Sequence, residues 1–345
     1  MAKKPMDPAV KIVAGHVSDV PIAQQVRDLA KGRPDLLITS PAESVQWLRD
    51  NIGTALLAGM FHRGGEIVHC LRIGEEGYRP LTDRDRDDDG PAQVRPMSTS
   101  HIASYIQLFY WCYKLVKDET TGTLRPVATM VPSSAARPAV DFPGEQPHLR
   151  RLRGVTHSPL PRADGTILDT PGYDQQTRLL YLPDPDLLVK PVPAEPTSAQ
   201  VADALKLLRY MVQDFKFLTD HDEANYLGLL LTPLLRELAP PPYKLGVIGA
   251  PQPGSGKSLL AGVLRIVHGG VFRSEVPDDD AEMRKVITTI LDVTTGPVVQ
   301  LDNVSGVLRS SVLSGLLTSA TWEDRRLGSN SHMRGRNDRL WVLTG

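Results

Sequence analysis

The segment from Lys244 to Val267 carries residue types that bind a triphosphate. Its sequence predicts a short apolar strand, then a loop of glycine and proline, then an apolar helix that opens with GKS. Successive backbone N–H groups of such a loop, together with the positive end of the helix, surround phosphate oxygens. We therefore expect a phosphate-binding loop that consists of Pro253, Gly254, Ser255, Gly256, Lys257, Ser258 and Leu259.

Two side chains of this loop have expected roles. Lys257 is predicted to reach the β- and γ-phosphates, and the hydroxyl group of Ser258 is predicted to ligate Mg²⁺. The usual spacing requires a glycine where this chain has Pro251, a change that affects the first turn of the loop and not the groups that face phosphate. The alternative interpretation is a fortuitous glycine-rich turn. The strand before it, the helix after it and a second acidic motif argue against that alternative.

The second motif is GPVVQLDNV, in which Pro297 begins a predicted buried strand that ends at Asp302. An aspartate at this position holds the magnesium shell in nucleoside triphosphatases. A solvated Asp-Asn turn is the alternative. The next residue, Asn303, stands where many ATPases have a glutamate that activates water, and it cannot accept a proton. Hydrolysis therefore uses another base or is slow, and Glu282 and Glu323 are candidates that the sequence does not rank.

From Lys244 onward, apolar strands alternate with helices, which predicts a mainly parallel sheet. Strands are expected at 245–248, 271–276, 297–302 and 339–345, and helices after GKS, at 278–293 and at 307–320. The stretch 322–340 is expected to be polar and rich in arginine. Ahead of these elements, Ser198 is expected to cap a helix with one buried apolar face, formed by Val201, Leu205, Leu208, Val212 and Phe215. A second helix is expected from about Asp220 to Pro240, with a kink at Pro233.

The upstream sequence predicts an α+β region. Ser40 is expected to cap a helix, Gly64 and Gly65 to turn a hairpin, and a helix near 99–109 to lead into two strands. Asp164 and Gly165 form a predicted tight turn. We expect three parts: an α+β domain at 1–132, a strand- and turn-rich connection with a Pro-rich linker at 133–197, and a helical lead-in with an α/β domain at 198–345.

The composition excludes several classes of protein. A formal net charge of -1 gives no global attraction to nucleic acid or to anionic membranes, so such binding needs a local patch. Two cysteines, Cys70 and Cys112, are too few for a disulfide framework. The densest apolar stretch is interrupted by Pro233 and Arg236 and is too short to span a bilayer, so we expect a cytoplasmic protein without a membrane partner.

Three weaker signals have simpler explanations. Asp85 to Gly90 resembles the start of a calcium loop, but Pro96 stands where the final glutamate is required. His221 lies among carboxylates at 219–223, and a helix cap with acidic residues in the first turn explains this run better than a metal site. Trp111 and its aromatic neighbours fit a half-buried strand better than a surface for stacking bases.

The motifs resemble the P-loop ATPases of phages, plasmids and integrative elements that accompany or form part of primase and replicative helicase proteins (AAA+/replicative-helicase-like). The resemblance covers about residues 145–345 and rests on the order of LRGVTHSPLPRADGTILDTPGYD, APQPGSGKSLLA, EMRKVITTIL, VVQLDNV, LLTSATWEDRRLG and WVLTG. It implies a P-loop core with an additional strand, ATP and Mg²⁺ as cofactors, and ATP hydrolysis stimulated by single-stranded or forked DNA in a homo-oligomeric ring. Arg325 and Arg326 match the DR.LG pattern of the family. The resemblance therefore implies a catalytic role for Arg326 at a neighbouring nucleotide or at DNA; solvated loop arginines are the alternative.

The resemblance also bears on what this chain lacks. A sensor asparagine of the family would follow Gly345, so we expect a C-terminally truncated ATPase whose sheet lacks the last strand beside the phosphate-loop strand. A nucleotide-binding regulatory protein, or a truncated remnant with weak hydrolysis, is the competing function. A small-molecule kinase also shares the phosphate loop. It is disfavoured because no arginine lid and acceptor pocket follow Asp302.

Overall fold

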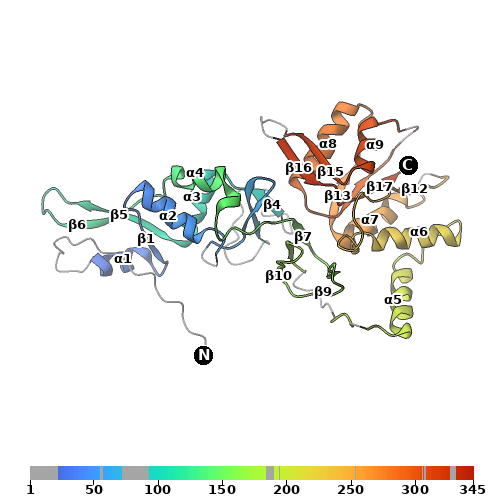
Figure 1. Ribbon diagram of the computed structural model, residues 1–345, viewed down its shortest axis with the longest axis horizontal. Helices are drawn as coiled ribbons and strands as arrows, with labels where there is room; N and C mark the ends of the chain where they lie inside the picture. Colours follow the sequence, from blue (N-terminus) through green and yellow to red (C-terminus); the bar gives the residue numbers. More distant parts are fainter. Residues whose placement is uncertain are drawn as a thin grey trace. The chain divides into compact units, whose positions relative to one another are not determined.

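The computed structural model describes residues 22–54, 57–71, 93–183, 190–193, 195–252, 254–304, 306, 308–326 and 332–345. The chain divides into two compact units, of which the first consists of Met1–Asp83 and Arg95–Arg151 and the second of Arg84–Val94 and Leu152–Gly345 (Figure 1). The three-part division expected from the sequence stays a prediction. Among the described residues, no helix combines the length and the apolar character that crossing a bilayer requires.

The first unit is α+β, as its local sequence signals predict. Its strands are β1 (Asp35–Leu37), β5 (Trp111–Lys117), β6 (Leu124–Ala128), β2 (Met60–Arg63), β3 (Glu66–Leu71) and the last two residues of β4 (Gln93–Pro96), in the sheets β1-β5-β6 and β2-β3-β4. Its α-helices are α1 (Ile22–Ala30), α2 (Pro41–Asn51), α3 (Thr99–Phe109) and α4 (Arg137–Asp141). Ser40 caps α2 through a bond from the Glu43 N–H group, and Gly64 and Gly65 turn the β2–β3 hairpin. Both predictions are confirmed.

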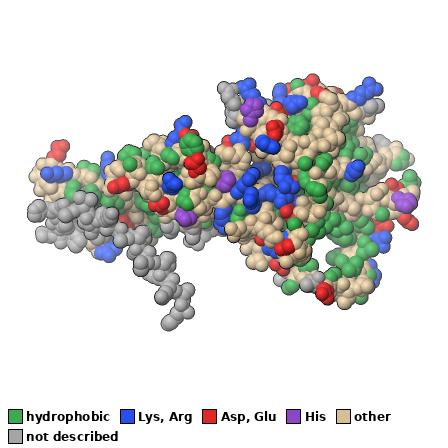
Figure 2. Space-filling model, in the orientation of Figure 1, with side chains coloured by type: hydrophobic (Ala, Val, Ile, Leu, Met, Phe, Trp, Pro, Cys, Tyr) green, Lys and Arg blue, Asp and Glu red, His purple; other side chains and the backbone are tan. Residues whose placement is uncertain are grey.

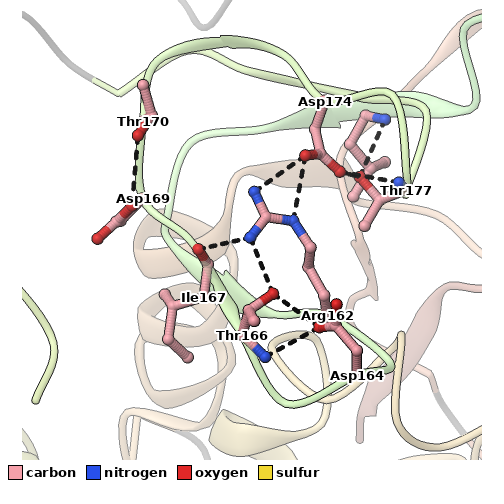
Figure 3. A network of polar contacts seen from close by, with 9 residues as sticks. Arg162, Asp164, Thr166, Ile167, Asp169, Thr170, Asp174 and Thr177 are labelled. Atoms are coloured by element: carbon pink, nitrogen blue, oxygen red, sulfur yellow. Dashed lines mark hydrogen bonds and ion pairs between the residues drawn. The ribbon is translucent and has the colours of Figure 1, made fainter. Parts of the chain in front are cut away.

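A set of short strands opens the second unit: β7 (Gly154–Thr156), β8 (Leu160–Pro161), β9 (Ile167–Leu168), β10 (Gly172–Tyr173) and β11 (Leu179–Tyr181). The predicted turn between β8 and β9 is present, with Gly165 at φ +85°. Figure 3 shows Arg162 holding these strands together. Its Nε and Nη2 atoms donate to Asp174 Oδ1 at 3.1 and 2.9 Å, and its Nη1 atom donates to the Ile167 carbonyl at 2.8 Å. Arg162 therefore fills a structural role.

The parallel sheet predicted for the C-terminal part is present. It contains β12 (Gly246–Ile248), β13 (Gly270–Arg273), β14 (Val298–Leu301) and β17 (Leu340–Thr344) in the order β12-β17-β14-β13, with every neighbouring pair parallel. The most exposed residue of β12 is Val247, with 64% of its surface accessible, so this strand is not the buried strand expected from its apolar sequence.

Helices cover both faces of this sheet (Figure 1). Val298, Leu340 and Val342 pack in one cluster with side chains of α6 (Asp220–Leu231) and α7 (Lys257–His268). The alternate positions Val299, Leu301 and Trp341 pack in another cluster with α8 (Asp280–Val293) and α9 (Ser311–Thr318). This alternation follows from the two-residue period of a strand, which sends successive side chains to opposite faces.

The helices before the sheet differ from the sequence-based expectations in three ways. The cap of α5 (Ser198–Tyr210) is Thr197, in a capping box with Gln200, and not Ser198, because the hydroxyl of Thr197 accepts from the Gln200 N–H group. Val201 and Leu205 of the expected buried face are 54% and 38% exposed. Hydrophobic side chains are accordingly visible on the surface around α5 in Figure 2.

The helix α6 ends at Leu231, so Pro233 terminates it and does not kink it. Proline lacks the N–H group that continuation of the helix requires.

The stretch 322–340 also differs from the polar segment expected, because it contains a hairpin. Its strands are β15 (Thr321–Arg325) and β16 (His332–Arg336), paired antiparallel. Trp322 of β15 and Met333 of β16 are buried in the hydrophobic cluster that also contains side chains of α8.

A buried ionic cluster lies at the amino edge of the sheet, just before β17. Arg153 Nη1 is 2.6 Å from Glu237 Oε2, and Arg153 Nη2 is 3.6 Å from Asp338 Oδ2. Arg339 donates to the carbonyls of Thr294 and Thr295 at 2.8 Å, at the end of α8. Burial raises the pKa of Asp338, but the arginines around it, Arg339 first, lower the pKa by more, so the carboxyl group stays ionised.

Candidate functional site

The loop between β12 and α7 contains two glycines in a left-handed backbone conformation. Gly254 and Gly256 have φ values of +73° and +84°, in the left-handed region that favours glycine. Gly256 is the N-cap of α7 and provides no side-chain cap, whereas α2, α3, α5, α6, α8 and α9 are each capped by a Ser, Thr or Asp side chain. The N–H groups of the first turn of α7 therefore receive no hydrogen bond from an N-cap side chain.

The predicted residues of this loop take the following positions. Lys257 is the first residue of α7 and is half-buried, and Ser255 and Ser258 are exposed. Leu259 is 64% exposed, on the surface of α7 away from the core. Pro253 lies outside the described residues.

The carboxyl edge of the sheet brings together two residues that are 44 positions apart in sequence, Ser258 and Asp302. The Ser258 hydroxyl group lies near enough to the Asp302 carboxylate to lower its pKa. Gln300 connects the same two residues, since its Nε2 atom donates to the Ser258 carbonyl at 3.1 Å and to Asp302 Oδ1 at 3.3 Å. The carboxyl ends of β12 and β14 meet at this edge because the strands are parallel, which is where ligands bind in open α/β sheets.

Thr344, near the end of β17, completes this cluster and was not predicted from the sequence. Its hydroxyl group donates to Asp302 Oδ1 at 2.5 Å and accepts from the Asn303 N–H group at 3.2 Å. The order of the strands explains its position, because β17 lies between β12 and β14. The only sequence signal was its place at the carboxyl end of a predicted strand.

The environment of Asp302 favours the charged form. Burial of the side chain raises the pKa, but hydrogen bonds from Thr344, Ser258 and Gln300 lower it by more, so the pKa lies below the usual range. A half-buried, ionised carboxylate next to a hydroxyl group is a ligand set of the kind that Mg²⁺ prefers. The residues present therefore fit Mg²⁺ bound together with a phosphate.

Asn303 follows Asp302 in a left-handed backbone conformation, with φ +59°. The next residue, Val304, donates its N–H group to the Thr344 carbonyl at 2.8 Å. This bond, together with the bond from the Asn303 N–H group to the Thr344 hydroxyl group, fixes the turn that follows β14.

The other candidate catalytic residues have partners outside this cluster. Arg326 Nη2 is 2.9 Å from Asp292 Oδ1 and the side chain is only 13% exposed, so Arg326 is not a solvated loop arginine. Glu282 pairs with Lys285 on the surface of α8. Glu323 pairs with Arg334 across the β15–β16 hairpin.

The weaker sequence signals have their simpler explanations in the structure. Thr219 and Asp222 form a capping box at the start of α6, which accounts for the acidic run around His221. Trp111 is buried in β5 and stacks on Tyr113 with ring centroids 4.9 Å apart. The acidic loop at 85–90 lies outside the described residues. Within the part of the chain that the structure describes, no cluster of three or more His, Cys, Asp or Glu residues is arranged to hold a metal ion.

No protein-family model matches this sequence, and no curated protein matches it. Among solved structures, the chain is similar to one described as "The A form apo structure of NrS-1 C terminal region-CTR". The identity is 17% and the TM-score is 0.29, over 67% of this chain. The match spans about half, 53%, of that structure's own length. A TM-score this low carries no argument about function.

Proposed function

We propose that residues 198–345 form a P-loop domain that binds ATP with Mg²⁺ and hydrolyses it. The observation that carries this proposal is that Gln300 bonds to both Ser258 and Asp302 beside the start of α7, which has no side-chain cap. The two residues come from separate sequence motifs, and a fortuitous glycine-rich turn does not explain why they meet.

Each residue of the cluster has a part in this reaction. The N–H groups of Gly254 to Ser258 bind phosphate oxygens, and Lys257 neutralises charge that develops on the outer phosphates as water attacks. Ser258 and Asp302 would hold Mg²⁺, which would supply further neutralisation of charge on the phosphates. Thr344 and Gln300 orient the Asp302 carboxylate through their hydrogen bonds.

We propose that the domain acts on DNA during replication, as a homo-oligomeric ring. The β15–β16 hairpin supports this part of the proposal, because its exposed face carries Glu323, Arg325, His332, Arg334 and Arg336. This face has more positive than negative side chains, so it suits a phosphate backbone although the whole chain is nearly neutral. Arg326 would then act from a neighbouring subunit only after leaving Asp292.

A nucleotide-binding regulatory protein with weak hydrolysis is the second candidate. Asn303 favours it, because an amide cannot accept a proton from water and the surface acids Glu282 and Glu323 are both paired. Turnover with and without single-stranded DNA separates the two functions. A motor domain releases phosphate faster when DNA is added, and a regulatory protein binds ATP without this stimulation.

The substitution Lys257→Ala tests ATP binding itself. We expect it to weaken ATP binding at least ~tenfold, measured by isothermal titration calorimetry, because the positive side chain assigned to the outer phosphates is lost. Lys285→Ala is the matched control, since Lys285 also lies near the start of a helix but pairs with Glu282. Equal affinities of the two variants and the parent protein would refute the proposed phosphate site.

A further inference from the structure

The segment that joins α5 and α6 lies against the phosphate-binding loop. The Cε1 atom of Phe215 is 3.1 Å from the position that a Cβ atom on Gly256 would occupy. The ring therefore takes up the space that a side chain at Gly256 would need. Phe217, two residues later, packs with Phe215 against the cluster that contains Leu260 and Ile248, on the same side of the sheet as α7.

A cavity of about 550 Å³ opens on this segment. Its walls include Tyr210, Gln213, Phe215, Phe217, Asp220 and Glu223. This volume lies in the range of small-molecule sites, which is roughly 300–1,000 Å³. Because Phe215 borders both the cavity and Gly256, the cavity adjoins the loop that is proposed to hold the phosphates.

The lining of the cavity distinguishes between the parts of a nucleotide. Two cations, Lys206 and Arg209, and two acids, Asp220 and Glu223, line the cavity, and Arg209 pairs with Glu223 at 2.9 Å, so the lining gives a phosphate group no net positive charge to bind. A planar base is neutral and carries amino groups that donate to carboxylate or amide oxygens. The aromatic residues supply faces on which a base stacks.

We propose that this cavity binds the base and ribose of the nucleotide whose phosphates lie at Gly254–Ser258. Phe215 stacks on the base, and the Gln213 amide and the Asp220 carboxylate bind its polar edge. A purine base matches this lining, because it offers a large stacking face together with polar atoms at its edge. The inference rests on the proposed phosphate site and adds to it the part of the chain that selects the nucleoside.

The test compares two ligands on the full chain by isothermal titration calorimetry in Mg²⁺, namely ATP and inorganic tripolyphosphate. Tripolyphosphate occupies the phosphate loop and has no base. We expect the parent protein to bind ATP more tightly. Equal affinities would overturn the base site and leave the phosphate loop intact, whereas failure to bind either ligand would overturn the proposed function and the base site with it.

Variants then assign the preference to the cavity. Phe215→Ala is expected to weaken ATP binding about tenfold and to leave tripolyphosphate binding unchanged, because stacking on one base is lost. Gln213→Ala is expected to have a smaller effect in the same direction. Phe142→Ala, which removes an exposed phenylalanine from the first unit, is the control and should change neither affinity.

Phe215 also packs against the protein itself. Weaker ATP binding by Phe215→Ala could therefore come from lost packing and not from lost stacking on the base, and a second variant separates the two causes. Phe215→Leu keeps the apolar contact with Gly256 and loses the aromatic face, and it should still weaken ATP binding selectively. If Phe215→Ala, Phe215→Leu and Gln213→Ala each weaken both ligands equally, or neither, the cavity does not bind the base and the inference is wrong.

Discussion

The two edges of the β12-β17-β14-β13 sheet both gather charged side chains, but they differ in access to solvent. At the amino edge, Arg236 and Asp338 are 3% and 8% exposed and belong to a network of opposite charges. At the carboxyl edge, Asp302 is half-buried and is surrounded by neutral donors, beside an exposed glycine loop. The buried charge network at the amino edge therefore stabilises the fold. At the carboxyl edge, the Asp302 carboxylate has neutral neighbours and is available to bind a cation.

The largest expected effect tests the amino edge. Asp338→Ala should lower the free energy of unfolding by about 3–5 kcal/mol, because it leaves the buried arginines without their shared carboxylate. Urea titration followed by circular dichroism measures this. Asp203→Ala is the control, because Asp203 forms an exposed pair with Lys206 and should cost at most ~0.5 kcal/mol. Similar losses in the two variants would mean that the buried network does not support the sheet.

Ionisation of Asp338 should also make the stability of the folded protein depend on pH. Asn cannot ionise, so Asp338→Asn should be less stable than the parent protein by about 2 kcal/mol at pH 7. The folded-state pKa of Asp338 lies below its unfolded value, so its stabilisation is complete above that unfolded value and is lost as the pH falls through the folded pKa. The stability difference between the two proteins should therefore shrink below pH ~4. A difference that stays constant down to pH 2 would contradict an ionised Asp338.

The next effect tests the carboxyl edge. Asp302→Asn should weaken ATP binding in the presence of Mg²⁺ about tenfold, or about 1.4 kcal/mol, because the proposed ligand of the metal loses its charge. Affinity for ATP without the metal should be unchanged or higher, and stability should change by less than ~1 kcal/mol. Calorimetry with and without EDTA measures the first two quantities. A large loss of stability with unchanged affinity would make Asp302 structural, like Asp338.

The smallest effect concerns Thr344. Thr344→Val keeps the shape of the side chain and removes the hydrogen bond to Asp302, at a cost of about 1 kcal/mol in unfolding free energy. Without this donor, the pKa of Asp302 should rise, which NMR titration of the carboxyl group measures. Thr156→Val is a comparison variant, since the Thr156 hydroxyl donates to the Ser158 carbonyl and not to Asp302. Only Thr344→Val should shift the Asp302 titration.

Much of this architecture could be predicted from local signals. The cap at Ser40, the turn at Gly64 and Gly65 and the helix that follows GKS depend on neighbours within a few residues. The meeting of Ser258 with Asp302 could also be predicted, because parallel strands place their carboxyl ends at one edge. These predictions required only periodicity and chain order.

Other features depend on contacts between distant segments and had weak sequence signals. The β15–β16 hairpin looks polar because Trp322 and Met333 are its main buried residues and charged residues separate them. Thr344 acquires its role only when β17 lies between β12 and β14. The exposure of Val201 likewise depends on what packs against α5, which the helical period of its own sequence does not determine.

The left-handed turn at Asn303 limits how this site can be re-engineered. A substitution intended to speed up the proposed hydrolysis would first place a glutamate at this position as a base. The φ value of +59° suits asparagine, whereas a longer side chain there carries a strain of roughly 1 kcal/mol. The exchange would therefore demand a rebuilt backbone after β14, or a base recruited from another position. The turn, as much as the side chain, sets which catalysts this site accepts.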